Sequence, residues 1–267
     1  MKLYIKNYSS YRSDREDVDI RQLLKQKYKL DTRRQDDFIH LALYGAQMLK
    51  ERTPIREDDE LYVTSGYGDV DVIQRTNTYV NKEKEPLKLF DFINLLGNTT
   101  SYYVAKSLNI RGKNIFQISD NFTYINSLVS LYASIKNSQK DAILCAIDLA
   151  STPTEVSKRV LGVEKDVKIV SSVNYQKFSL DAEDAIAEVE FDLKIYSQDE
   201  IHAMMQNGRK AVFNAVRCAK AKNSEDAVLF ETMASDALNR ALAKNEDMLY
   251  IDCYEEKYKI LKLKSLK

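Results

Sequence analysis

The chain has 267 residues, enough to fill one large α/β domain or two small ones. Its 40 basic and 40 acidic residues leave it near neutral, which argues against nucleic acid as the main partner, because phosphate binding favours a basic excess. The sequence has no apolar run of membrane-spanning length, and its first residues lack the apolar stretch of a signal peptide. We therefore expect a cytoplasmic protein without a membrane span.

Cysteine and histidine are scarce. The three cysteines, Cys145, Cys218 and Cys253, have no CxxC spacing, which argues against a disulfide framework and a thiolate metal site. Cys145 lies within an apolar run and is interpreted as an inert core thiol. His40 is predicted on the polar face of a helix, and His202 at a surface or interface. We expect neither a metal nor a cofactor.

Strands and helices alternate along the chain. Residues 2–7 alternate in the manner of an edge strand, and residues 34–50 have helical spacing. The further predicted elements are a strand at 59–65, a turn at 66–68, a helix at 69–82, an apolar helical stretch at 87–96, a helix capped by Asn98 or Thr99 and ending at Leu108, a strand at 114–118, a helix at 122–135, strands at 141–149, 166–175 and 184–195, helices from 197 to about 221 and from 224 to 244, and strands at 248–254 and 257–263. This order predicts a mostly parallel sheet between helix layers.

The most informative stretch runs from Ile110 to Asn121 and continues as Phe122-Thr-Tyr124. It has the pattern of a strand that leads into the N-terminus of a buried helix. Reactive side chains are often placed at such a junction, because the helix dipole points at it. Asp120 is predicted to cap the helix.

Five segments, in order and spacing, resemble the β-ketoacyl synthases, which have the thiolase-like fold: Asp31-Thr-Arg-Arg34, Thr64-Ser-Gly-Tyr-Gly68, Phe92-Ile-Asn-Leu-Leu-Gly-Asn98, the stretch 110–121, and Lys140-Asp141. The resemblance covers about residues 30–195, the N-terminal half of such an enzyme. It implies an α/β, thiolase-like, layered helix/sheet/helix fold with a mostly parallel core sheet and a much reduced C-terminal half. Residues 1–195 would form a β-ketoacyl synthase N-terminal-like domain, and residues 196–267 a short helical and strand extension packed on it.

The sequence departs from this family at the catalytic positions. Asn121 stands where the family has its nucleophilic cysteine, and an amide cannot form an acyl thioester. The resemblance also implies two catalytic histidines in a C-terminal half, and the sequence has no matching histidine pair. No catalytic set is therefore intact, and the interpretation leans toward a protein that is not an enzyme.

By resemblance to chain length factors, we expect a non-catalytic subunit that pairs with an active ketosynthase, or with itself, in polyketide or fatty-acid-type biosynthesis. The candidate acyl-tunnel or interface residues are Phe92, Leu96, Tyr102, Tyr103, Ile115, Gln117 and Phe122. An acyl carrier protein is a further candidate partner for the basic tail 257–267, whose other interpretation is a solvated edge strand. Two alternatives stay open: a malonyl-carrier decarboxylase or diverged acyltransferase that uses the Asn121 region, and a homodimeric acyl-binding scaffold.

Overall fold

The computed structural model describes residues 1–119, 121–150, 168–205, 211–213, 228–229 and 232–267. Its elements are β1 (Lys2–Arg12), α1 (Ile20–Gln26), α2 (Asp37–Lys50), β2 (Glu60–Ser65), α3 (Val70–Asn77), the π-helix η1 (Thr78–Glu83), α4 (Leu89–Asn94), α5 (Gly97–Leu108), β3 (Asn114–Ile118), α6 (Thr123–Ser138), β4 (Ala142–Asp148), β5 (Lys168–Ile169), β6 (Ser172–Ser179), β7 (Ala187–Phe191), α8 (Gln198–Met205), β8 (Ala211–Phe213), β9 (Val228–Leu229), α9 (Met233–Lys244), β10 (Met248–Tyr254) and β11 (Lys257–Ser265).

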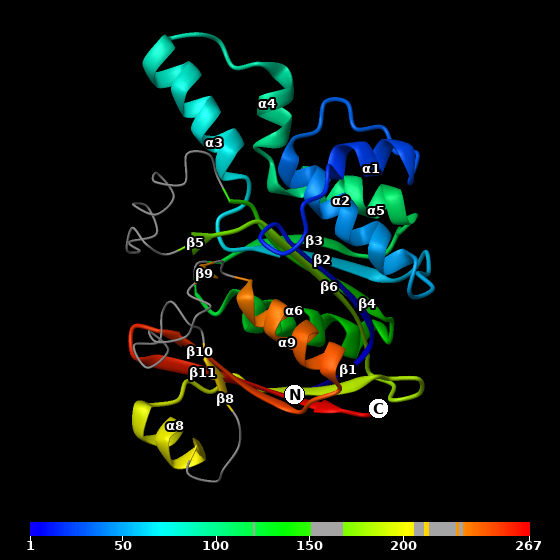
Figure 1. Cartoon of the computed structure of the whole chain (residues 1–267), viewed down its shortest axis with the longest axis vertical. Coiled ribbons are helices and arrows are strands. Elements are labelled where there is room, and N and C mark those ends of the chain that lie inside the picture. Colours follow the sequence, from blue (N-terminus) through cyan, green and yellow to red (C-terminus); the bar gives the residue numbers. More distant parts are fainter. Residues whose placement is uncertain (120, 151–167, 206–210, 214–227, 230–231) are drawn as a thin grey trace.

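One nine-stranded sheet organises the described chain, in the order β3-β2-β4-β6-β1-β7-β11-β10-β8. Figure 1 shows that the sheet curls around α6 and α9, with α1, α2 and α5 on the opposite face of its first half and α8 outside its second half. Helices and sheet therefore alternate as layers, which confirms the layered α/β class expected from the sequence.

The prediction of a mostly parallel sheet is wrong for the nine-stranded sheet as a whole. Strands β3, β2 and β4 are parallel neighbours, as are β10 and β8, but β4–β6, β6–β1, β1–β7, β7–β11 and β11–β10 are antiparallel. Helical connections join β2, β3 and β4 through α3 to α6, and β8 and β10 through a segment that includes α9. The strands β10 and β11 are joined by the two-residue turn Glu255-Glu256, where both residues have positive φ, and such a turn forces antiparallel pairing.

Two strands that the sequence placed at a sheet edge lie inside it. Strand β1 runs between β6 and β7, and Leu3 and Ile5 are fully buried in the core within the curl. Strand β11, the basic tail, lies between β7 and β10. Alternation of polar and apolar residues marks one covered face and does not distinguish an edge strand from an inner strand.

The two largest apolar cores lie on either side of the sheet, and a smaller one packs α8 against β10 and β11. The larger core fills the curl, with side chains from α6 and α9 and from the strands around them. The second core lies between the first half of the sheet and helices α2 and α5. Helix α2 approaches the sheet closely at Gly45, where a Cβ atom would come within 2.7 Å of the Tyr175 ring, and Tyr175 Oη donates a hydrogen bond of 2.8 Å to Ala42 O.

Residues on both sides of position 195 belong to the same sheet, because β7 pairs with β11. The division of the chain into domains 1–195 and 196–267 stays a prediction.

Two local predictions are wrong. Helix α5 begins at Gly97 after Leu96, with no side-chain cap from Asn98 or Thr99. His40 is buried, not on a polar face: its Nε2 lies 3.2 Å from Thr32 O and its Nδ1 3.4 Å from Asp37 Oδ1. Helix α2 is covered on almost all sides, so its polar positions find partners inside the protein.

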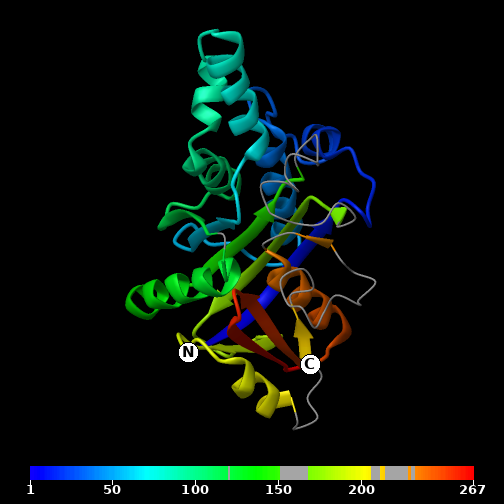
Figure 2. The ribbon, with the colours of Figure 1, turned by 90° about the vertical axis from the view of Figure 1, so that its left-hand side faces the viewer.

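Helices α3, η1 and α4 form an arm that projects from one end of the body (Figure 2). Arg75 in α3 pairs with Asp91 in α4 at 2.7 Å. At the base of the arm, Asp69 caps α3 by accepting from Val72 N at 3.1 Å, and Asp36 caps α2 by accepting from Ile39 N at 3.1 Å. Asp36 Oδ2 and Asp69 Oδ2 are both buried without a hydrogen-bond partner, and the two carboxyls are close enough to interact electrostatically, which favours one shared proton.

Replacement of Asp69 by asparagine is expected to change how stability depends on pH. Burial, and then Asp36, raise the pKa of Asp69 to about 9. The folded state therefore keeps a proton that the unfolded chain releases above about pH 4. Stability should fall as pH rises from about 4 to 9 and then level off. The Asp69→Asn amide donates to Asp36 at every pH, so urea unfolding across this range should show a weaker decline. The exposed Asp17→Asn control should retain the full decline.

Candidate functional site

The candidate site lies where the carboxyl ends of the parallel strands β2, β3 and β4 meet. Ser119 N donates to Ser65 O at 3.1 Å, which joins the ends of β3 and β2. The buried Asp148, at the end of β4, accepts hydrogen bonds from Ser65 Oγ at 3.0 Å and Gly66 N at 2.9 Å. Its other oxygen accepts from Thr232 N and Thr232 Oγ1, both at 2.8 Å, just before α9. One carboxylate thus holds three elements around the site.

Asn121 lies between β3 and α6, in the strand-to-helix corner that the sequence predicted. The next residue, Phe122, has φ 47° and ψ 31°, a left-handed conformation that is rare for a large side chain. The Asn121 carbonyl accepts from Ser119 Oγ at 2.8 Å and from Asn126 Nδ2 at 3.0 Å. The corner is therefore a tight, hydrogen-bonded turn. The predicted cap Asp120 lies outside the described residues.

Helix α6 begins at this corner with no side-chain cap. Within its first two turns, Ser127 Oγ donates to Thr123 O at 2.9 Å and shares a hydroxyl–hydroxyl hydrogen bond of 2.8 Å with Thr64 Oγ1, which joins the helix to β2. The free N–H groups of the first turn carry the positive end of the helix dipole. A partial negative charge on a ligand would be stabilised here.

Lys259 reaches the corner from the C-terminal hairpin. Its Nζ donates to Asn126 Oδ1 at 2.8 Å and lies 5.5 Å from the centre of the Phe122 ring. The Phe122 ring also meets Tyr254 edge-on at 6.4 Å. Burial lowers the pKa of Lys259, whereas Asp192 and Asp252 act to raise it. The hairpin β10–β11 therefore completes the site together with α6.

Lys259 and Asp148 were not among the predicted site residues. Lys259 lies on the same face of β11 as Leu261 and Leu263, which face the core, because the three are alternate residues of one strand. This alternation was a signal in the sequence that the Lys259 side chain is buried. Asp148 ends an apolar run, as strand-terminal polar residues commonly do, and nothing in the sequence indicated its partners.

No thiol or imidazole lies at the corner in the part of the chain that the structure describes. Cys145 is fully buried within β4, and burial raises the pKa of its thiol, as expected of an inert core cysteine. Cys253 is buried in β10. His40 lies in α2 and His202 in α8, and Cys218 is outside the described residues.

The seven candidate tunnel or interface residues divide by exposure. Phe92, Leu96 and Tyr102, on α4, α5 and the turn between them, are 52%, 49% and 56% exposed. Tyr103 is half-buried and meets Tyr102 edge-on, and Ile115 and Gln117 are half-buried on β3. Phe122 alone is buried at the corner.

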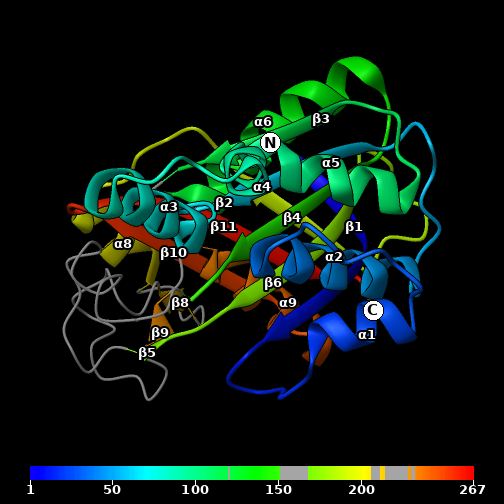
Figure 3. The same cartoon turned by 90° about the horizontal axis from the view of Figure 1, so that it is seen from above.

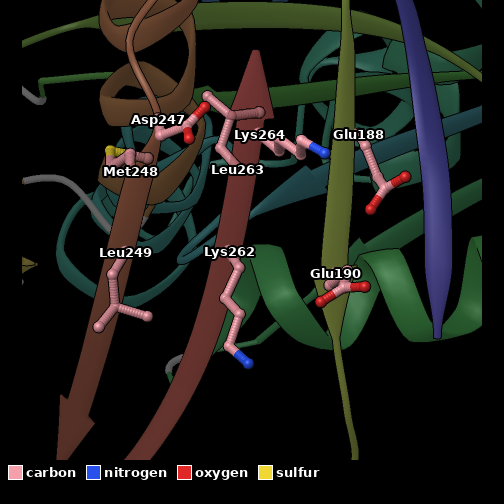
Figure 4. A pocket seen from close by; sticks show the side chains of 8 residues that line it. All are labelled: Glu188, Glu190, Asp247, Met248, Leu249, Lys262, Leu263 and Lys264. Atoms are coloured by element: carbon pink, nitrogen blue, oxygen red, sulfur yellow. The ribbon is translucent and has the colours of Figure 1, made fainter. Parts of the chain in front are cut away.

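A separate hollow of about 530 Å³ lies on the outer face of β7, β11 and β10 (Figure 4). Opposite charges face one another across its strands, since Glu190 is in register with Lys262 and Glu188 with Lys264. Lys2 on β1 adds an ion pair of 2.9 Å with Glu188. Pairs of opposite charges across neighbouring strands are typical of a sheet face in contact with water.

Comparison with solved structures finds similar folds at low sequence identity. The ishigamide ketosynthase/chain length factor matches with a TM-score of 0.66 and 12% identity, over 94% of this chain and 86% of that one. A ketosynthase in complex with its chain length factor from Xenorhabdus doucetiae matches with 0.65 and 8%, over 98% and 99%. A type II polyketide synthase acyl-carrier protein in complex with its ketosynthase matches with 0.67 and 9%, over 100% and 99%.

The chain has the thiolase-like fold of ketosynthases and chain length factors. No protein-family model matches the sequence, and no curated protein matches it. The similarity to the ketosynthase fold extends past residue 195, beyond the range 30–195 that the sequence motifs indicated. The most distinctive segment of the sequence, 110–121, thus pointed to the right fold.

Within the described ranges, no helix is both long and apolar enough to cross a membrane. The same residues contain no group of three or more histidine, cysteine, aspartate or glutamate side chains arranged to hold a metal ion.

Proposed function

We propose that this protein is a non-catalytic, chain-length-factor-like subunit that pairs with an active ketosynthase in polyketide or fatty-acid-type biosynthesis. The main support for the proposal is the strand-to-helix corner at Asn121. An amide side chain, Asn121, stands at the tip of α6, and no described thiol or imidazole accompanies it. A ketosynthase-like scaffold of this kind can bind and shape an acyl chain, but it cannot form a thioester at this position.

Pairing is supported by the surface beside the corner. Strand β3 is the last strand of the sheet, so one of its edges has no strand partner within the described residues. Figure 3 shows β3 and α6 along one side of the molecule, with α5 next to them. Phe92, Leu96, Tyr102 and Ile118, which we call the pairing face, are each about half exposed on elements that contact one another in series.

An exposed strand edge flanked by large apolar side chains favours association, because it leaves backbone hydrogen-bonding groups and apolar area to be covered. The structures of similar fold include a ketosynthase in complex with its chain length factor and a ketosynthase in complex with an acyl-carrier protein. These support a ketosynthase as the partner of the pairing face. An acyl carrier protein is a further partner in the same proposal.

Co-expression with the ketosynthase of the same host tests this proposal. We expect the two chains to co-purify as one complex, and the isolated chain to leave a malonyl-carrier thioester unchanged in mass spectrometry. A monomeric chain in the presence of that ketosynthase would contradict the proposal. A self-dimer that excludes the ketosynthase would favour the scaffold alternative, and decarboxylation of the thioester would favour an enzyme.

The aspartate substitution Phe92→Asp is expected to abolish or strongly weaken co-purification. A buried charge at the centre of an interface costs several kcal/mol, and central aromatic residues commonly contribute about 2 kcal/mol or more to binding. Leu193→Asp is the matched control: Leu193 is 67% exposed and follows β7, which is the sixth strand of the sheet counted from β3. Equal loss of complex in both variants would show that the pairing face is not the interface.

A further inference from the structure

Lys259 is a buried amine with unusual surroundings. Its side chain is 8% exposed, and it faces the core in register with the carboxylate-bearing Asp252. Its only hydrogen bond in the described part of the chain goes to a neutral amide, Asn126 Oδ1, and no carboxylate there lies within ion-pair distance of its Nζ. A lysine ammonium buried in this way is costly unless it binds an anion or loses its proton.

Loss of the ammonium proton fits this site better than anion binding. Burial lowers the pKa of Lys259, which increases the fraction of neutral amine. Asp192 and Asp252 are close enough to act on Lys259 electrostatically, and both would repel a bound anion. A desolvated, neutral lysine amine is a nucleophile toward carbonyl carbon.

We propose that Lys259 forms a reversible imine with the ketone or aldehyde carbonyl of an acyl ligand bound at the corner. The apolar part of such a ligand has partners in the edge-to-face rings of Phe122 and Tyr254 beside the amine. Its carbonyl oxygen would lie toward the uncapped N-terminus of α6, which stabilises partial negative charge. The inference concerns ligand binding by this chain and is independent of pairing with a ketosynthase.

The chemistry needs no further reactant. The Nζ lone pair forms a C–N bond to the carbonyl carbon while the carbonyl π electrons move to oxygen, and a proton transferred from nitrogen to that oxygen gives a carbinolamine. Loss of the hydroxyl group and of the second nitrogen proton, together as water, gives the C=N bond. Addition of water reverses each step.

Reductive trapping tests the proposal. The full chain is incubated with N-hexyl acetoacetamide, a ketone with an apolar tail and no thioester, and sodium cyanoborohydride. We expect one adduct, equal in mass to the probe less one oxygen atom, and peptide mapping should place it on Lys259. The yield should rise with pH and reach half its maximum below the pH at which an exposed lysine does so.

Two variants make the test decisive. Lys259→Arg keeps the positive charge and hydrogen-bonding capacity but cannot form an imine, so the adduct should be lost; Lys262→Arg, on the exposed face of β11, should label as the parent does. Circular dichroism checks that each variant is folded. An unlabelled parent chain, or equal labelling of Lys259→Arg, would overturn the proposal. Binding of hexyl succinate that survives in Lys259→Arg and is lost in Lys259→Met would instead identify an anion site. None of these outcomes alters the test of pairing.

Discussion

Replacing Asp148 with alanine is expected to lower the free energy of unfolding by about 4 kcal/mol, because it leaves four hydrogen bonds without their acceptor at roughly 1 kcal/mol or more each. The donors are Ser65 Oγ, Gly66 N, Thr232 N and Thr232 Oγ1, and all four bonds are buried. Water cannot readily replace a carboxylate in this position. Urea denaturation of the Asp148→Ala variant measures the loss.

Asp148→Asn should lose less than Asp148→Ala, because its amide oxygen still accepts from one pair of donors. Glu246→Ala is the control for a general effect of removing an acidic side chain, since Glu246 is exposed and its side chain makes no hydrogen bond to any residue that the structure describes. Its stability should stay within about 0.5 kcal/mol of the parent. If Asp148→Ala were equally mild, Asp148 would not hold β2, β4 and α9 together as described.

Replacing Lys177 with methionine should cost about 3–5 kcal/mol, the usual effect of removing one partner from a buried ion pair. Lys177 Nζ, in β6, lies 2.8 Å from Asp59 Oδ2 and donates to Pro54 O at 2.9 Å. Asp59 is fully buried at the start of β2, so Lys177→Met would leave its carboxylate without this cation. Thermal and urea unfolding measure the change.

The lysine Lys264 offers a matched control for this prediction. It too is a strand lysine opposite a carboxylate, Glu188, but it is exposed. Surface ion pairs contribute about 0–1 kcal/mol, so Lys264→Met should hardly change stability. The double variant Lys177→Met with Asp59→Asn should recover part of the loss, because it removes a buried carboxylate that has lost its closest cation and keeps only the half-exposed Arg56, whose Nε lies 3.4 Å from Asp59 Oδ1. No recovery would mean that the loss came from packing alone.

Local patterns in the sequence predicted the elements well. The strands 114–118 and 248–254 have the predicted bounds, and the predicted strand 59–65 and helix 34–50 correspond to β2 and α2. Each of these segments has a continuous apolar run or a clear period, which depends only on neighbouring residues. The helix predicted from 197 to about 221 is only partly correct, because α8 spans Gln198–Met205 and the short strand β8 spans Ala211–Phe213.

Local sequence patterns could not predict the order of the strands in the sheet. Alternation in β1 and β11 is compatible with an edge or an inner strand, and only pairing with β6, β7 and β10 decides between them. The burial of His40 has the same origin, because Thr32 and the second core cover a face that helical spacing alone marked as polar.

The candidate site was predicted in part. The strand-to-helix corner at Asn121 follows from a contiguous motif, so it was visible in the sequence. Lys259 lies 138 positions later (259 − 121) and reaches the corner only because the C-terminal hairpin folds back against α6. Such a contact depends on the path of the whole chain, and the alternation of lysines in the tail favoured a solvated surface instead.

Hydrogen–deuterium exchange of the chain, alone and with its ketosynthase, tests the central claim most directly. If β3 pairs with the partner, amides of residues 114–118 should exchange several-fold more slowly in the complex, whereas those of the inner strand β11 should change little. Slower exchange confined to other surfaces, with β3 unchanged in a complex that demonstrably forms, would contradict the account.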